Sequence, residues 1–350
     1  YVLMQLPMSI WMDRVGTRYV MTACILLTVV GTVPLIVSHH WVYLLMGRAL
    51  IGIGSSGAIV GLFHIIRMTF PDRHFSRMLS FSVAIGLLGA MYGGYPVSVM
   101  TQHLHYKTVV AIFCIIGMGL AGATYSIVPK VKGEGVTTAF AQIKAIFSYR
   151  DVFLFCCCSG LMVGPLEGFA DVWGSEFLKQ VYGFNTTVAN TLPSLIFMGM
   201  CLGGPILSII AEKIGYYLSV IITAGILMLL AFGVLMAGVL TAWSVGVCFV
   251  LIGICCAYQM LVIYTASTFV PKHLAGLTTT VANMMIMGFG YVFHTVIGFV
   301  IDVKGGIHSA DAFMQGIWVI PIALAMGVLG LICFARHVAA KRSPQQVVAS

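Results

Sequence analysis

Residues 9–18 read SIWMDRVGTR, and residues 208–217 read SIIAEKIGYY. At an offset of 199 positions the serine, the acid, the base that follows it and the glycine recur in register. Two further matches come in the same order, at offsets of 200 and 201: Pro71 with Pro271, and LIGIG at 50–54 with LIGIC at 251–255. An ordered series of matches at one period indicates an internal duplication. The sequence therefore predicts two copies of one structural unit.

Both copies of this stretch lie between long apolar segments. Ten segments reach the roughly 20 residues that a helix needs to cross a bilayer, and a shorter one runs from Tyr1 to about Trp11. The ten lie near 19–38, 42–69, 79–101, 107–128, 151–170, 187–210, 217–239, 242–269, 276–301 and 316–335, the fifth with room to extend toward Leu178. The ten-residue alternation typical of barrel strands is absent from the sequence, so we expect helices.

The composition places this chain in a membrane. Of its 350 residues, 60% are hydrophobic and 8% are charged, with a mean hydropathy of +1.04, whereas globular proteins carry roughly 25% charged residues. All ten cysteines lie inside apolar runs, and none stands at metal-ligand spacing. Soluble enzymes, disordered chains and disulfide-stapled secreted modules are thereby excluded, and no metal site is expected. We predict an all-α integral membrane protein.

The basic residues predict an orientation for the chain. Fourteen of the eighteen Lys and Arg residues lie in alternate connections that share one side, and only Lys107, Lys179 and Lys304 lie on the other side. Loops rich in Lys and Arg are typical of the cytoplasmic face. The formal net charge of +8 is therefore interpreted as a topology signal and not as a nucleic-acid surface. We expect a multi-pass protein of the cytoplasmic (inner or plasma) membrane, with its C-terminus in the cytoplasm.

The longest connection divides the spans into two groups. We predict a first helix bundle at 1–128, a cytoplasmic linker at 129–150, a second bundle at 151–335 and a cytoplasmic tail at 336–350. Six spans follow the linker, while four full spans and a partial one precede it. Because the two groups are copies, we expect six helices in each, with the first helix and half of the second missing from the sequence at hand.

Three motifs of the first bundle carry a resemblance to a known family. Asp13-Arg14-x-Gly16-x-Arg18, with Ser9 in place of the leading glycine, resembles the loop signature of the major facilitator superfamily. Arg48 with Gly52 and Gly54 resembles the pattern of that family's fourth helix. The stretch GAMYGG at 89–94 resembles the fifth-helix Gly-Pro-x-x-Gly-Gly pattern of antiporters, with alanine replacing the proline. The resemblance implies a major facilitator fold of two six-helix bundles.

The resemblance also implies that the two related loops act as gates. In this family, such loops lock the helix ends together on one side of the membrane, and motion breaks the contacts. The gating residues would be Asp13, Arg14, Gly16 and Arg18 in the first copy, and Glu212, Lys213 and Gly215 in the second. The alternative is that these residues are ordinary positive-inside anchors. The acid Asp13 argues against that alternative, because anchoring requires no carboxylate.

Two charged residues inside spans are the main candidates for substrate binding or coupling. Arg48 lies about a turn and a half from one end of its helix, where a cation needs a partner or contact with water. Glu167, in the sequence GPLEGFAD at 164–171, is expected where a helix breaks and lines a cavity, as a proton-coupling site and a partner of Arg48. The alternatives are that Arg48 snorkels to the interface and that Glu167 lies at an external helix end.

The remaining candidates are uncharged or titratable polar residues within spans, together with glycines. Gln259, Asn283 and His294 are candidate substrate or coupling residues, and the spacing of the last two puts them on one helix face. The alternative for these residues is a packing role. The glycines of the family motifs would allow close helix approach; they are Gly52, Gly54, Gly89, Gly93 and Gly94.

Together these features predict a secondary active transporter that moves a small solute by alternating access. We expect no enzyme activity and no cofactor, with a proton or other ion gradient as the driving force and uptake of a small organic metabolite as the function. The alternatives are a proton-driven exporter of drugs or siderophore-like compounds and, in another class, a membrane-embedded receptor or enzyme. The expected partners are a small-molecule substrate and the lipid bilayer, without nucleic acid, and we expect a monomer.

Overall fold

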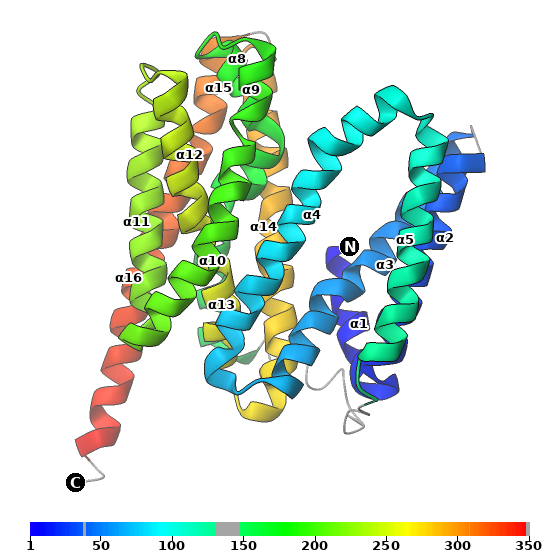
Figure 1. The fold of residues 1–350 in the computed structure, drawn as a ribbon. Helices are drawn as coiled ribbons and strands as arrows, with labels where there is room; N and C mark the ends of the chain where they lie inside the picture. Colours follow the sequence, from blue (N-terminus) through cyan, green and yellow to red (C-terminus); the bar gives the residue numbers. More distant parts are fainter. Residues whose placement is uncertain (38–39, 131–147, 308, 348–350) are drawn as a thin grey trace. The chain divides into compact units, whose positions relative to one another are not determined.

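The computed structural model describes residues 1–37, 40–130, 148–307 and 309–347, and these residues are almost entirely helical (Figure 1). The prediction of an all-α fold is confirmed. The described chain falls into two compact units. The first comprises Tyr1–Phe75, Leu88–Ser148 and Pro271–Met284, and the second comprises Ser76–Leu87, Tyr149–Val270 and Met285–Ser350.

The first unit is built on the N-terminal helices. Within it, α2 packs against both α3 and α5, and α1 packs against α2 and α3 (Figure 1). These helices are α1 (Val2–Val15), α2 (Thr17–Val37), α3 (Trp41–Thr69) and α5 (Tyr106–Ile127), with the short turn η1 (Asp72–His74) after α3.

The second unit contains most of the C-terminal helices. There α10 packs against α12, and α11 packs against both α12 and α16. The helices are α7 (Arg150–Gly160), η2 (Gly164–Trp173), α8 (Gly174–Gln180), α9 (Thr186–Thr191), α10 (Ser194–Ile214), α11 (Tyr217–Leu235), α12 (Ala242–Cys256), α13 (Tyr258–Ser267), α15 (Ala310–Ile317) and α16 (Val319–Val347).

Two long helices belong to both units. Residues 76–87 of α4 (Phe75–His103) group with the second unit, although they follow α3 directly in sequence. Conversely, residues 272–284 of α14 (Lys272–Val303) group with the first unit, although they follow α13. Each of the two sequence copies therefore places the beginning of one helix among helices of the other copy.

The predicted spans agree with the helices of the structure. Among the described residues, nine helical segments are long and apolar enough to cross a membrane. A further helix, α4, has 29 residues and covers the predicted span at 79–101. The fifth predicted segment continues past Leu178, as a membrane-length run from Arg150 to Gln180. The predicted boundary between the two bundles falls largely on residues 131–147, outside the described residues, and the predicted domain limits stay a prediction.

The span from Arg150 to Gln180 changes its helix type near the middle. Pro165 has no backbone N–H, so the α-helical hydrogen-bond ladder of α7 cannot continue through it. The chain turns after Gly160, and the ten residues Gly164–Trp173 form a π-helix. π-helical segments are rare and are found mostly at functional sites. The break that the Gly-Pro pair predicted is therefore present, and it puts Glu167 in the first turn of the π-helix.

Candidate functional site

Glu167 is the half-buried carboxylate of this π-helix. Its backbone carbonyl accepts a hydrogen bond from Nε2 of His294 in α14. Because a carbonyl oxygen can only accept, His294 carries a proton on Nε2 in this contact. Gly290, one turn before His294, makes room for the carboxylate stem: a Cβ there would lie 2.9 Å from the Glu167 Cβ. The structure thus brings together two predicted candidates, Glu167 and His294, and they meet through the backbone carbonyl of Glu167.

Gln259 lies in the same unit and is 2% exposed. Among the described residues, its amide Nε2 has no hydrogen-bond partner. The neighbouring Tyr258 is also buried, and its hydroxyl donates to the Ser159 carbonyl at 2.7 Å, which joins α13 to α7. An unpaired buried amide costs about 1–3 kcal/mol. The unpaired Nε2 keeps Gln259 a candidate for substrate binding.

Arg48 lies in α3 of the first unit, and its side chain is exposed. No hydrogen bond or ion pair joins it to another residue that the structure describes. Glu167 lies in the second unit, and the pairing of Arg48 with Glu167 stays a prediction.

The helices that contain Ser9 and Ser208 both end at a glycine with positive φ. Gly16 has φ 105° and Gly215 has φ 75°, both in the region that favours glycine. The Gly16 N–H donates to the Met12 carbonyl at 3.0 Å, and the Gly215 N–H donates to the Ala211 carbonyl at 2.9 Å. The ψ angles differ, at 138° for Gly16 and −1° for Gly215, so what recurs at the offset of 199 is the positive φ and the hydrogen bond that ends each helix.

The charged residues of these stretches lie in helices and not in loops. Both α1 and α10 extend past their acids, which places Asp13 and Glu212 in the last turn of each helix. A helix C-terminus disfavours negative charge, and each acid has a basic partner close by. Asp13 Oδ1 lies 3.0 Å from His64 Nε2 of α3, and Glu212 pairs with Arg77 of α4.

The other predicted gating cations make few contacts. Arg14 and Lys213, which are equivalent by the repeat, are both exposed. Arg18 donates from Nη2 to the Ser126 carbonyl at 3.0 Å, and its guanidinium lies 4.9 Å from the ring centroid of Tyr125. Arg18 therefore joins α2 to the end of α5 within the first unit.

A row of buried polar residues joins α1 to the beginning of α14 in the first unit. Asn283 Nδ2 donates to Gln5 Oε1 at 2.8 Å, and Thr280 Oγ1 donates to Ser9 Oγ at 3.3 Å. Gln5, Ser9 and Thr280 are 0% exposed, and Asn283 is 6% exposed. We call these four residues the α1–α14 seam. All of its groups are amides or hydroxyls, and one of them is the predicted candidate Asn283.

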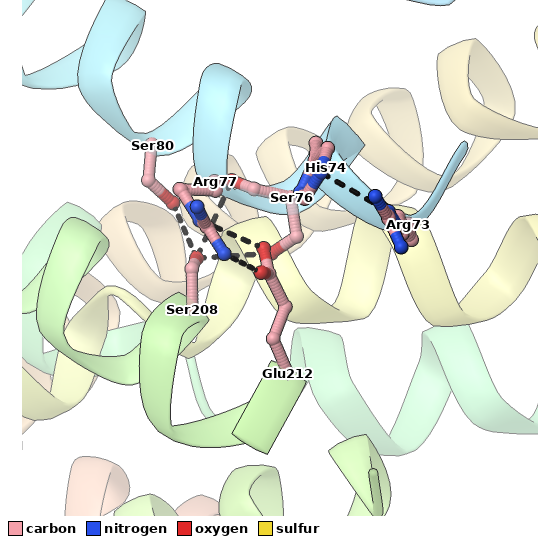
Figure 2. Close-up of polar contacts among 7 residues, drawn as sticks. All are labelled: Arg73, His74, Ser76, Arg77, Ser80, Ser208 and Glu212. Carbon is pink, nitrogen blue, oxygen red and sulfur yellow. Dashed lines mark hydrogen bonds and ion pairs between the residues drawn. The ribbon is translucent and has the colours of Figure 1, made fainter. Parts of the chain in front are cut away.

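A second row joins the beginning of α4 to α10 in the second unit (Figure 2). The Ser208 hydroxyl lies 2.9 Å from the Ser76 hydroxyl and 2.7 Å from the Ser80 hydroxyl. Arg77 forms a bidentate ion pair with Glu212: Nε donates to Oε1 at 3.2 Å, and Nη2 donates to Oε2. We call these five residues the α4–α10 seam.

The two seams are related by the repeat. Ser208 is the repeat equivalent of Ser9, and Ser80 is the equivalent of Thr280 at an offset of 200. The hydroxyl contact between α10 and α4 is therefore the same contact as the one between α1 and α14, with the roles of the two copies exchanged. This equivalence explains why the beginnings of α4 and α14 each group with helices of the other copy.

Most seam residues were not among the predicted site residues. Arg77 was counted only as a cation of a basic loop, and Gln5, Ser76, Ser80 and Thr280 were not singled out. A usable signal was present in the spacing, because Gln5, Ser9 and Asp13 recur every four residues along one face of α1. The same spacing links Ser76 to Ser80 and Ser208 to Glu212.

The predicted packing glycines differ in their surroundings. Gly54 is buried against α2, and a Cβ there would lie 2.9 Å from the Thr28 nitrogen. At Gly52 a Cβ would meet only the Tyr1 nitrogen at 3.6 Å, and at Gly89 it would meet no described atom within 4 Å. Gly93 and Gly94 lie in α4, in the stretch 90–96 whose surroundings fall outside the described residues.

The comparison with family models decides the classification, because the model of the Major Facilitator Superfamily matches residues 1–295. The chain belongs to the Major Facilitator Superfamily. Members of this superfamily are transporters, not enzymes, and the chain is a multi-pass membrane protein of the secondary transporter class. It follows that a small-molecule substrate and the lipid bilayer are its partners.

Solved structures of this superfamily share the fold. The fucose:proton symporter of E. coli superposes with a TM-score of 0.72 at 12% identity, covering 95% of this chain and 87% of that chain. An outward-facing bacterial homologue of the iron transporter ferroportin gives 0.69 at 12% identity, with coverages of 96% and 87%. A bacterial homologue of the human lysosomal transporter Spinster gives 0.58 at 17% identity, with coverages of 96% and 86%. No curated protein matches the sequence.

Proposed function

We propose that this superfamily transporter uses a proton gradient to take up a small organic metabolite, with Glu167 as the residue that carries the proton. The observation that supports this proposal most is the position of Glu167. Glu167 is half-buried and lies inside a membrane-length segment, in the π-helical interruption. His294 donates a hydrogen bond to the backbone carbonyl of Glu167. Ionisable residues inside membrane spans are costly and mark proton and substrate pathways.

Arg48 is the proposed contact for an anionic group of the substrate. A guanidinium is permanently charged and matches the geometry of a carboxylate or phosphate. Arg48 is exposed on α3, and within the described part of the chain its charge is not neutralised by an ion pair. Gln259 of the second unit is a separate candidate for ligand binding, because its buried Nε2 has no hydrogen-bond partner among the described residues.

Alternating access requires contacts that break on one side of the membrane while others form on the opposite side. We propose that the α1–α14 seam and the α4–α10 seam are these contacts on the side of the basic loops. Following the distribution of Lys and Arg, we propose that this side, and with it the C-terminus, is cytoplasmic.

A ligand panel tests the substrate class first. The purified protein is heated in detergent with small anionic metabolites, siderophore-like chelators and hydrophobic cations. A ligand present at a hundred times its dissociation constant stabilises the folded protein by about 2.7 kcal/mol, which raises Tm measurably. The uptake proposal predicts a shift with a small anion that disappears in Arg48→Ala. Shifts with only hydrophobic cations or chelators would favour the exporter and contradict a role for Arg48 in anion binding.

Proton coupling is tested with the ligand that the panel identifies. In proteoliposomes with an inward proton gradient, Glu167→Gln is expected to abolish uphill uptake while retaining ligand exchange across the membrane. The matched control is Glu176→Gln, which removes the same charge from α8, where Glu176 contacts Lys179 and Gln180. Gradient-driven uptake that persists in Glu167→Gln would remove this residue from the coupling mechanism.

A further inference from the structure

Sulfur atoms gather where α1 meets α2 in the first unit. Met4, Met8 and Met12 recur every four residues, so they share one face of α1. On α2, Met21 and Cys24 lie one turn apart. These five residues form or border a single buried hydrophobic cluster. The surfaces of the two helices that meet therefore carry several thioethers and a thiol.

Two of these sulfurs stand at the separation expected of two ligands on one metal ion. The Cys24 Sγ lies 3.6 Å from the Met8 Sδ. Metal–thiolate bonds at tetrahedral sites are about 2.3 Å long, so two sulfur ligands of one ion lie roughly 3.8 Å apart. An ion can therefore join α1 to α2 through these two side chains with little movement of either helix.

A third sulfur lies beside this pair, against two glycines of α3. The nearest atom that a Cβ at Gly57 would meet is the Cys24 Sγ, and the nearest that a Cβ at Gly61 would meet is the Met21 Sδ. Because Gly57 and Gly61 are about one turn apart, the two sulfurs lie along one face of α3. A methionine side chain has three rotatable bonds and adapts to its surroundings, so Met21 can complete a site of three sulfur ligands.

A cavity in the same unit gives an ion access to these sulfurs. The cavity has a volume of about 360 Å³ and lies among α2, α3 and α5. Met21 and Cys24 both line it, and so does Cys114 of α5. An ion in this cavity can thus reach Cys24 without the separation of α1 from α2.

The donor atoms determine which ion fits the site. Within the part of the chain that the structure describes, no three His, Cys, Asp or Glu side chains come together to hold a metal ion, so a site here relies on thioethers. Thiolate and thioether ligands select Cu(I), whereas Mg²⁺, Ca²⁺ and Mn²⁺ prefer oxygen ligands. A monovalent cation that replaces the thiol proton of Cys24 also leaves the net charge unchanged, which avoids the cost of an unpaired buried charge.

We propose that Met8, Met21 and Cys24 bind one Cu(I) ion between α1 and α2. On binding, the Sγ–H bond of Cys24 breaks, its proton leaves to solvent and a sulfur–copper bond forms, with the copper remaining Cu(I). The bound ion joins two helices of the first unit and stabilises their contact. This inference goes beyond the proposed function, in which the proton is carried by Glu167 of the second unit.

Competition for Cu(I) under anaerobic conditions tests the site. The purified protein carries Cys333→Ala, which removes an exposed thiol, and is titrated against the coloured Cu(I) complex of bathocuproine disulfonate. Cys24→Ala removes the thiol ligand, and Met8→Leu removes a thioether with little change in volume. The matched control is Met228→Leu, because the Met228 Sδ also lies 3.6 Å from a buried thiol, that of Cys256 in the second unit.

The parent protein is expected to withdraw one Cu(I) ion from the complex. Loss of even an outer-shell partner weakens metal sites by about 10–100-fold, so Cys24→Ala and Met8→Leu are each expected to weaken Cu(I) binding by at least about tenfold. Met228→Leu is expected to bind Cu(I) as the parent does. X-ray absorption of the parent is expected to show sulfur neighbours alone, at about 2.3 Å from the copper.

Three results would overturn the proposal. The first is unchanged Cu(I) binding in both Cys24→Ala and Met8→Leu, each shown to be folded by its elution profile and Tm. The second is an equal loss of binding in Met228→Leu, which would mean that the copper does not depend on the α1–α2 contact. The third is nitrogen or oxygen neighbours in the absorption spectrum, which would mark an adventitious ion only.

Discussion

The α1–α14 seam and the α4–α10 seam show how one duplicated arrangement is held by two kinds of chemistry. In both seams a serine of one copy bonds a hydroxyl near the beginning of a helix from the other copy, at 3.3 Å and 2.7 Å respectively. The first seam adds a pair of buried amides, and the second adds an ion pair. The duplication therefore decides which helices meet, while individual side chains decide how strongly they are held.

The two seams also differ one helical turn before Ser9 and Ser208. The repeat equivalent of Gln5 is Gly204, so the amide contact of the first seam has no counterpart in the second. At Gly204, α10 instead approaches α4 closely, because a Cβ there would lie 3.1 Å from the Ser80 Cβ. One seam uses a polar pair at this level, and the other uses close packing of a small residue, as is common between membrane helices.

The largest predicted effect is a complete block of transport when either seam is cross-linked. Ser80→Cys with Ser208→Cys, and Ser9→Cys with Thr280→Cys, replace hydroxyl pairs that lie at 2.7 Å and 3.3 Å. Residues this close can form a disulfide with little backbone movement. Oxidation is expected to abolish substrate flux in either double variant, and dithiothreitol is expected to restore it.

Flux that survives cross-linking of one seam alone would show that this seam does not have to open. The four single cysteine variants serve as controls, since oxidation is expected to leave their flux unchanged. If substrate flux survived oxidation in only one of the two double variants, the two seams would not be functionally equivalent, contrary to what the repeat implies.

A smaller effect is predicted at the two glycines that end α1 and α10. Gly16 has φ 105° and ψ 138°, a conformation that other residues rarely adopt, whereas Gly215 has the ordinary left-handed values of 75° and −1°. Gly16→Ala is expected to lower the free energy of unfolding by about 2 kcal/mol. Gly215→Ala is expected to cost about 1 kcal/mol, and equal losses in a denaturant titration would contradict this ranking.

The smallest predicted effect compares the two seam serines. Ser208→Ala removes contacts to the Ser76 and Ser80 hydroxyls and leaves both of them buried, so a loss of about 1.5 kcal/mol is expected. Ser9→Ala removes one longer contact to Thr280, and about 0.5 kcal/mol is expected. Unfolding of the two purified variants under identical conditions measures the difference, and a larger loss in Ser9→Ala would reverse the ranking of the seams.

The helices could be predicted from the sequence because a bilayer demands a fixed apolar length. The predicted span at 42–69 and the helix Trp41–Thr69 differ by a single residue. The break at Pro165 was predictable too, since a missing N–H acts locally. The interruption at Ala257 between α12 and α13 was not predicted. Neither proline nor glycine marks it in the sequence.

The candidate site was harder to predict, because its contacts join residues that are far apart in the sequence. Asp13 is among the predicted gating residues, but its partner His64 lies 51 positions away, and nothing near Asp13 in the sequence points to it. Arg77 resembled any cation of a basic loop, and its role depends on the beginning of α4 lying beside α10. Local periodicity reports which face of a helix is polar, but not which helix that face meets.

The most direct test of the account measures the two seams in one experiment. Spin labels at Arg14 and Lys272 report on the ends of α1 and α14, and labels at Met78 and Lys213 report on α4 and α10, each pair lying within one unit. Double electron–electron resonance in lipid nanodiscs then gives the distance distribution of each pair. We predict that each pair of spin labels has one population at a short distance and one at a long distance. The fraction at the long distance is the same in both pairs, and it changes by the same amount in both pairs in Arg77→Gln. A long population in one pair while the other stays short would contradict the claim that the two seams open together.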